Sequence, residues 1–165
     1  MINKHYKNQN GYSLIETVFY IVLFSILSLA VINALISMTK SFTETATHAE
    51  LMQVSPVIER ITHEIRQATS ITSITNNNTD LLLQTTGTNT SVEFLLSGTN
   101  VQLKENGATT GNLNTPDIAI TGLTFTQITS TNSKAVKVDI SARYLKDKQA
   151  REEHFYDTVI LRGSY

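Results

Sequence analysis

A long apolar stretch near the N-terminus constrains this chain of 165 residues more than any other feature. From Thr17 to Thr39 no residue is charged, and most are Leu, Ile, Val or Phe. As an α-helix rising 1.5 Å per residue, the stretch would be roughly 35 Å long, enough to cross the hydrocarbon core of a bilayer. A secretory signal has a hydrophobic region of only about 7 to 15 residues, followed by a small-residue cleavage site. We therefore interpret the stretch as a membrane helix that stays attached to the protein.

A single carboxylate, Glu16, stands at the start of this stretch. An ionised carboxylate in hydrocarbon is costly unless it is paired, protonated or close to the interface. Cleavage after Gly11 would make Glu16 the fifth residue of the mature chain. The plainer alternative is a single-pass signal anchor with Glu16 at the headgroup level. In both cases Lys4 and Lys7 place the N-terminus in the cytoplasm, and the C-terminal domain lies outside the cytoplasmic membrane.

Gly11, the segment Tyr12-Ser-Leu-Ile-Glu16 and the apolar stretch resemble the class III signal of type IV prepilins and type II secretion pseudopilins. The resemblance implies that prepilin peptidase cuts between Gly11 and Tyr12, removing a leader of residues 1–11, and that the new amine of Tyr12 is N-methylated. It also implies that Glu16 meets the N-terminal amine of a neighbouring subunit inside a filament. A buried carboxylate facing an ammonium is paired, which would account for its position.

Two departures from the family pattern qualify the resemblance. Tyr12 stands where the family more often has Phe or Met, and residues 17–39 lack the Pro that major pilins often carry. The second departure favours a minor subunit. The predicted function is therefore a structural subunit, a minor pilin or pseudopilin, of a type IV pilus, a type II secretion system or a competence pseudopilus, reaching the cell surface in the filament. Its expected partners are prepilin peptidase, other pilin subunits and the inner-membrane assembly platform. The alternative is a membrane-anchored extracellular β domain that binds a ligand.

After the anchor of residues 12–39, the spacing predicts an amphipathic helix over residues 40–70. Its apolar positions recur every three or four residues, at Val57, Ile58, Ile61, Ile65 and Ala68. Ser55-Pro56 interrupts the pattern, because Pro removes a backbone hydrogen bond and clashes with the preceding turn. Either the helix kinks there, or a second helix begins with Ser55 as its N-cap and Pro56 in its first position.

Residues 71–165 have the composition of an antiparallel β domain, with Thr, Ser, Asn and Gly between short apolar runs. Asn106-Gly107 is the strongest hairpin signal, because a type I′ turn requires positive φ at both central residues. Gly122 shifts the alternation of its strand and predicts a bulge. A helix followed by a hairpin-rich sheet gives an α+β class. Seven strands are expected, at residues 81–86, 91–96, 101–105, 108–111, 117–130, 135–144 and 154–161.

Three segments of this region resemble minor pseudopilins of the J type and their relatives in type IV pili. They are Ile58-Glu-Arg-Ile-Thr-His-Glu-Ile-Arg-Gln-Ala68, Ile120-Thr-Gly-Leu-Thr-Phe125 and Thr158-Val-Ile-Leu-Arg162. The resemblance implies the same α+β architecture, a long helix packed on an antiparallel sheet.

The cysteine content and the charge distribution argue against disulfide bonds and against a nucleic-acid interface. The formal net charge is −1, and there is no cysteine, so the domain must be held together by packing alone. The basic residues near the C-terminus alternate with acidic ones, which argues against a nucleic-acid interface and for a solvated face. They are Lys134, Lys137, Arg143, Lys146 and Lys148, interleaved with Asp139 and Asp147.

No pattern in the sequence predicts catalysis, a cofactor or a metal site. His63-Glu64 begins like a zinc protease motif, but Gln67 occupies the position of the second His. His48 and His154 have no ligand partners at a suitable spacing, His5 belongs to the leader, and Asp117 lacks the flanking residues of a calcium loop. We therefore do not expect an enzyme.

Overall fold

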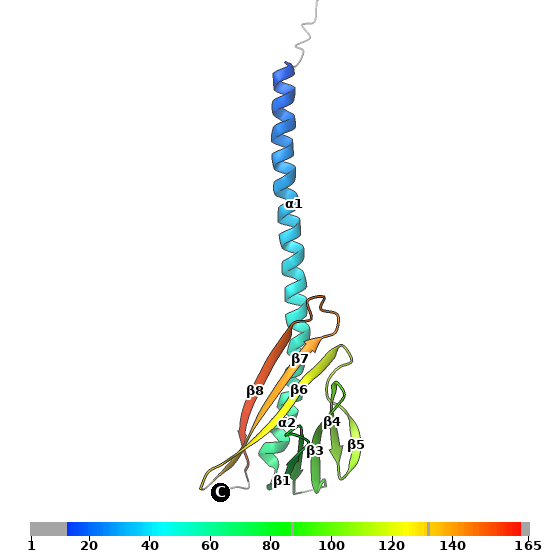
Figure 1. The fold of residues 1–165 in the computed structure, drawn as a ribbon, viewed down its shortest axis with the longest axis vertical. Helices are drawn as coiled ribbons and strands as arrows, with labels where there is room; N and C mark the ends of the chain where they lie inside the picture. The colour runs from blue at the N-terminus through cyan, green and yellow to red at the C-terminus, as the bar shows by residue number, and fades with distance from the viewer. Residues whose placement is uncertain (1–12, 87, 132, 163–165) are drawn as a thin grey trace, which may run out of the picture. The chain divides into compact units, whose positions relative to one another are not determined.

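The computed structural model describes residues 13–86, 88–131 and 133–162. The chain divides into two compact units, residues 1–44 and residues 45–165. The architecture is α+β, as predicted: one long N-terminal helical segment is followed by antiparallel β-sheets (Figure 1). The helical segment consists of α1 (Leu14–Leu51), the 3₁₀ turn η1 (Met52–Val54) and α2 (Ser55–Gln67).

Pro56 explains the short interruption between α1 and α2. Proline has no N–H to donate, and its ring clashes with the carbonyl four residues earlier, which is that of Met52. The N–H of Ser55 donates to the Met52 carbonyl instead, in the tighter 3₁₀ geometry. The predicted N-cap role of Ser55 is wrong. Val54 holds that position in a helical conformation, because the backbone does not leave the helical region between the two helices.

The apolar face of α2 is buried, as its spacing predicts. Four of the predicted side chains are at most 2% exposed, and Ile58 packs at the edge of the core. The buried four are Val57, Ile61, Ile65 and Ala68. Most of the stabilisation of this helix therefore comes from burying one face, as in most helices of this length.

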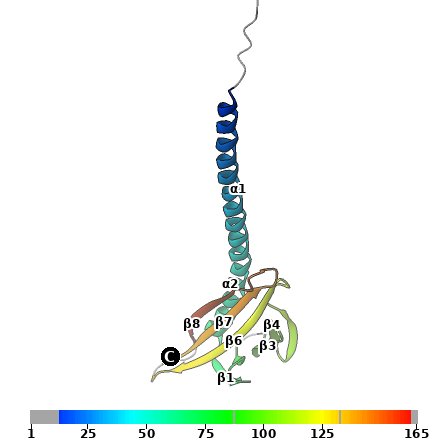
Figure 2. The ribbon, with the colours of Figure 1, turned by 45° about the horizontal axis from the view of Figure 1, so that its top comes forward.

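The strands form two antiparallel sheets, where the sequence indicated only one β domain. The first has the order β1-β2-β3-β4-β5 and the second has the order β6-β7-β8 (Figures 1 and 2). Their bounds are β1 Ser70–Thr75, β2 Asp80–Gln84, β3 Ser91–Ser97, β4 Asn100–Glu105, β5 Ala108–Asn112, β6 Ile118–Thr129, β7 Lys134–Tyr144 and β8 Glu152–Ile160. Each predicted strand lies within two residues of an observed one, and β1 was not predicted.

Two turn predictions are confirmed by the backbone. Asn106 and Gly107 have φ values of 52° and 81°, as a type I′ turn between β4 and β5 requires. The register between β6 and β7 shifts between Ile120 and Gly122, where Gly122 predicted a bulge. A side chain at position 122 would lie 3.3 Å from the hydroxyl oxygen of Ser141, so the glycine also permits close packing of the strands.

The two sheets and α2 enclose one core. Phe94 of the first sheet, Phe125 of the second and Ile61 of α2 are all fully buried in the same cluster. Asn114, in the connection between the sheets, is also buried. Its Oδ1 accepts from the N–H of Val101 at 2.9 Å, and its Nδ2 donates to the carbonyl of Ile118 at 2.7 Å. This side chain therefore bonds the backbone of both sheets.

The outer edge of β6 is closed by turns of the first sheet. The N–H of Ile120 donates to the carbonyl of Thr99 at 3.0 Å, and the N–H of Phe125 donates to that of Asn78 at 2.7 Å. Asn76, Asn77 and Asn78 all have positive φ, which brings the carbonyl of Asn78 to this edge. The opposite edge of the sheet is formed by β8.

Candidate functional site

Glu16 lies in the first turn of α1. The N–H groups of Glu16 and Thr17 donate to the carbonyl of Ser13 at 2.9 and 3.2 Å, so the helix begins directly before it. A carboxylate at this end of a helix is favoured by the macrodipole, by roughly 0.3 to 1 kcal/mol when exposed. Gly11 and Tyr12, the predicted cleavage and methylation residues, lie outside the described residues.

Tyr20 is a contact of Glu16 that was not predicted from the sequence. Its hydroxyl donates to Oε1 of Glu16 at 3.2 Å, one helical turn further along. The separation of four residues was a signal for this contact, because such residues lie on the same face of a helix. The hydrogen bond uses one carboxylate oxygen and leaves Oε2 without a partner among the described residues.

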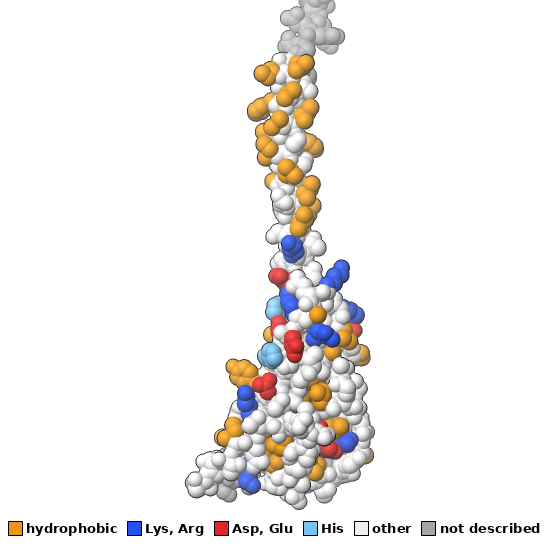
Figure 3. Space-filling view, in the orientation of Figure 1, with side chains coloured by type: hydrophobic (Ala, Val, Ile, Leu, Met, Phe, Trp, Pro, Cys, Tyr) orange, Lys and Arg blue, Asp and Glu red, His pale blue; other side chains and the backbone are white. Residues whose placement is uncertain are grey.

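Hydrophobic side chains are exposed along α1 from Val18 to Met38, and Figure 3 shows those on one face. The large hydrophobic residues from Val18 to Met38 are each 50% to 69% exposed, so no face of this segment is buried in the part of the chain that the structure describes. By its length and composition, the helical segment is long and apolar enough to cross a membrane. A helix that is apolar all round is stable only in lipid or against other protein.

Two hydroxyl groups within the apolar segment are satisfied by the helix itself. Ser25 donates to the carbonyl of Ile21 at 2.8 Å, and Thr39 donates to that of Leu35 at 2.9 Å. These two hydroxyls therefore have a partner that does not depend on water. The segment suits a membrane or a dry helical bundle.

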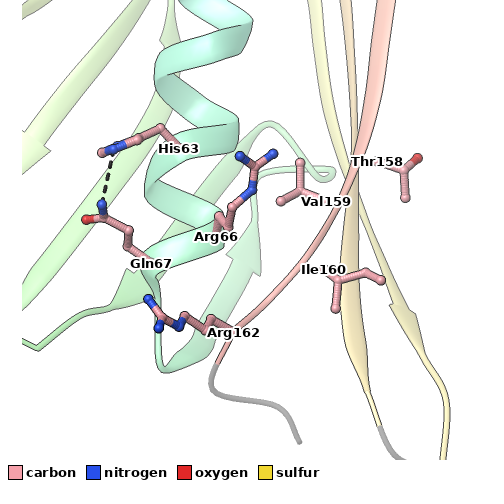
Figure 4. Close-up of a pocket in the computed structure, with 7 residues that line it drawn as sticks. All are labelled: His63, Arg66, Gln67, Thr158, Val159, Ile160 and Arg162. Carbon is pink, nitrogen blue, oxygen red and sulfur yellow. Dashed lines mark hydrogen bonds between the residues drawn. The ribbon is translucent and has the colours of Figure 1, made fainter.

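A groove runs between α2 and β8. It consists of two hollows, of about 610 Å³ and 460 Å³, which share His63 and Arg66 in their linings. Figure 4 shows the larger hollow, with Arg66 and Gln67 on α2, Val159 and Ile160 on β8, and Arg162 just beyond the strand. No local pattern in the sequence predicts this groove, because its two sides are far apart in the chain.

His63 and Glu64 do not form a metal centre. The ring nitrogen Nε2 of His63 lies 3.1 Å from Nε2 of Gln67, and the carboxylate of Glu64 pairs with Arg60 at 2.9 Å. Within the described ranges, no group of three His, Cys, Asp or Glu side chains could hold a metal ion.

The remaining candidate residues have structural partners. His48 pairs with Glu153 at 2.9 Å, and His154 shares a hydrogen bond with Ser141 at 2.8 Å. Asp117 accepts from Nζ of Lys146 at 2.8 Å, and this hydrogen bond raises the pKa of Lys146.

Asp147 organises the loop between β7 and β8. Its carboxylate accepts from Nε of Arg151 at 3.0 Å, from the N–H of Arg151 at 3.0 Å and from the N–H of Gln149 at 3.2 Å. The hydrogen bonds from Arg151, first from its side chain and then from its backbone, lower the pKa of Asp147 to about 2. The loop between β7 and β8 is thus held by the ion pair of Asp147 and Arg151.

Comparison with known proteins gives one match. Residues 6–32 match the family described as the prokaryotic N-terminal methylation motif. The match spans the predicted cleavage position, Glu16 and the first part of the apolar helix. No curated protein matches the chain, and no solved structure matches it.

Proposed function

We propose that this chain, which is type IV pilin-like by its methylation motif and its α+β architecture, is a minor subunit of a filament that assembles through its N-terminal helix. One observation carries the proposal: the methylation motif coincides with an apolar helix, none of whose faces is buried against the described residues. The motif indicates a structural subunit rather than an enzyme, and it implies processing by prepilin peptidase and assembly with other pilins.

The proposed maturation removes residues 1–11 and methylates the amine of Tyr12. Glu16, the fifth residue of the mature chain, then pairs with the Tyr12 amine of an adjacent subunit. Its Oε2, which has no partner among the described residues, is available for that ammonium. Charge-assisted hydrogen bonds of this kind are the stronger ones in proteins, so the pair would fix the position of one helix against the next.

We assign the minor role because α1 runs from Leu14 to Leu51 without a break. A proline within the segment would allow a helix to open in a tightly packed filament, and residues 17–39 contain none. The filament would be a type IV pilus, a type II secretion pseudopilus or a competence pseudopilus. The resemblance of segments in α2, β6 and β8 to minor pseudopilins of the J type supports the role of a minor subunit in such a filament.

The proposed location is the cytoplasmic membrane before assembly and the filament afterwards. Lys4 and Lys7 precede the apolar helix, whose large side chains would be exposed to the acyl chains. The positive-inside rule then places the leader in the cytoplasm, where prepilin peptidase would act on it, and residues 45–165 outside.

The decisive experiment is to determine the mature N-terminus. The full chain is expressed with and without a prepilin peptidase, and its intact mass and N-terminal sequence are measured. With the peptidase, we expect a wild-type chain that begins at Tyr12 and carries one methyl group, and without the peptidase we expect the uncut chain. The matched variant Gly11→Val should stay uncut in both cases. A wild-type chain that still begins at Met1, or one cut between Ser37 and Ala46, would contradict the proposal. The second outcome would indicate an ordinary secretory signal.

A further inference from the structure

Strand β8 forms an open edge of its sheet. The N–H of Leu161 donates to the carbonyl of Lys134 at 3.0 Å, so at this position the chain points its backbone groups towards β7. Because the direction alternates along an antiparallel strand, the N–H and C=O groups of Ile160, Thr158 and Tyr156 point away from the sheet. No strand pairs with this side of β8 in the described part of the chain.

The β8 edge differs from the opposite edge of the same sheet, which is formed by β6. The outer N–H groups of Ile120 and Phe125 donate to carbonyls in turns of the first sheet, so β6 cannot accept another strand there. Beside β8 lies the groove instead, with α2 as its other wall. An unpaired strand edge next to a helix is the arrangement by which some domains bind an extended peptide as an additional strand.

Arg66 and Arg162 give the groove a positive end (Figure 4). Both side chains are exposed, and neither forms an ion pair with any described residue. The N–H of Arg162 donates to the carbonyl of Arg66 at 3.3 Å, which fixes their backbones side by side. Arg66 lies in the last turn of α2, where the helix macrodipole favours a cation. The macrodipole accounts for a cation at Arg66, but it does not account for Arg162. The hollow that the two arginines line contains no acidic residue.

The other end of the groove has the opposite charge. Glu59 and Asp157 line the smaller hollow. Oδ1 of Asp157 accepts from the N–H of Thr158 at 2.7 Å, so one of the outward donors of β8 is already used. A peptide in the groove would therefore form its backbone hydrogen bonds with β8 at Ile160 and Tyr156. The opposite charges of the two ends would favour an acidic side chain at the arginine end of the peptide.

We propose that this groove binds an extended acidic segment of a partner protein, which adds to β8 as a fourth strand. Backbone hydrogen bonds to the outer edge of β8 hold the segment, and an Asp or Glu side chain of the segment accepts from Arg66 and Arg162. Guanidinium groups bind carboxylates in a planar, two-pronged geometry, so this contact selects acidic side chains over their amides. The site lies within residues 45–165 and does not depend on filament assembly through α1.

A selection on the full chain tests the proposal. Wild-type protein in lipid nanodiscs is exposed to a phage library of random 12-residue peptides, after depletion on empty nanodiscs. The double variant R66Q/R162Q is selected in parallel, and R143Q/K148Q is the matched control because it removes two positive charges outside the groove. We expect acidic, extended peptides from the wild type and the control, but not from R66Q/R162Q. Thermal melts should be the same for R66Q/R162Q and the wild type, because both arginines are exposed.

The best peptide is then synthesised in modified forms and its affinity is measured by fluorescence anisotropy. Replacing its acidic residue by the amide should weaken binding about tenfold on the wild type and leave binding to R66Q/R162Q unchanged. Two further peptides are N-methylated at every second backbone amide, one at the odd-numbered and one at the even-numbered positions. One of them should lose binding and the other should keep it, because an added strand pairs through alternate residues. The proposal is overturned if no peptide is enriched, if R66Q/R162Q selects the same peptides, or if the two N-methylated peptides bind equally.

Discussion

The hydroxyl of Tyr20 and the carboxylate of Glu16 are hydrogen-bonded at 3.2 Å, one turn apart on α1. The contact holds Oε1 on its own helix and leaves Oε2 without a partner among the described residues. We expect Tyr20→Phe to weaken incorporation of the subunit into filaments without abolishing it. The contribution of one such hydrogen bond is about 0.5 to 1.5 kcal/mol, and the carboxylate itself remains. Crosslinking to other pilin subunits measures the effect. Incorporation as poor as that of a chain lacking the carboxylate would show that Tyr20 has a larger role than orienting Glu16.

A fragment that begins at Lys40 should be a soluble monomer with its own core. The large exposed hydrophobic residues are concentrated before position 39, whereas residues 45–165 form a compact unit. Removing the apolar helix therefore removes most of the surface that would cause association. Light scattering after size exclusion and a thermal melt followed by circular dichroism test this. An aggregated fragment, or one that melts without cooperativity, would contradict an autonomous core.

Within that fragment, Ile65→Asp should be severely destabilising. The side chain of Ile65 is fully buried between α2 and the sheets, so the substitution removes an apolar contact and buries an unpaired charge. We expect a loss of at least about 3 kcal/mol in the free energy of unfolding. The matched variant Gln67→Asp introduces the same charge on the exposed face and should cost less than about 1 kcal/mol. Equal urea midpoints for the two variants would show that the packed face of α2 is wrongly assigned.

Features imposed by a single element could be predicted from the sequence. The spacing of Ile61 and Ile65 identifies the buried face of α2, because only one side of a helix can contact a core. Asn106-Gly107 identifies its turn, because few other residue pairs accept positive φ twice. The methylation motif is also local, so the residues around Glu16 are sufficient to locate the candidate assembly site.

Features that join distant parts of the chain could not be predicted in this way. The groove brings Arg66 together with Arg162, and no local pattern connects them. The contact between the two sheets at Asn78 and Phe125, where the N–H of Phe125 donates to the carbonyl of Asn78, is equally non-local. Strand β1 was missed for another reason. A register irregularity between Ile71 and Ser73 breaks its alternation, and half-buried side chains lie on both of its faces.

The stability of the fragment should respond to acid through Asp147. Its pKa is lowered to about 2 in the folded chain, from an ordinary value of 3.8. A depressed pKa means that the ionised form stabilises the fold. This contribution is complete above about pH 4 and is lost as the pH falls towards 2. Asp147→Asn should therefore melt at a lower temperature than the parent at pH 6, and the two should converge near pH 2. Lys148→Gln, in the same loop, is the control and should follow the parent throughout. Parallel curves for parent and Asp147→Asn from pH 6 to pH 2 would contradict the role of the Arg151 pair.

Replacement of Glu16 by alanine separates anchoring from assembly. A simple anchor should insert as well as the wild type or better, because the substitution removes a charge from the start of an apolar helix.

In a filament subunit, the same substitution should leave the Tyr12 ammonium of a neighbour without its partner in an apolar bundle, at a cost of about 3 to 5 kcal/mol. Cleavage after Gly11 should persist, because the carboxylate is not at the scissile bond. We therefore expect a processed, membrane-inserted Glu16→Ala chain that is poorly incorporated into filaments, as measured by crosslinking to other pilins. Glu16→Gln is the matched control for shape and should be equally defective, because it removes the charge and keeps the size of the side chain. If both variants are incorporated like the wild type, Glu16 has no partner in the filament, and the favourable position at the start of α1 is sufficient to explain this residue.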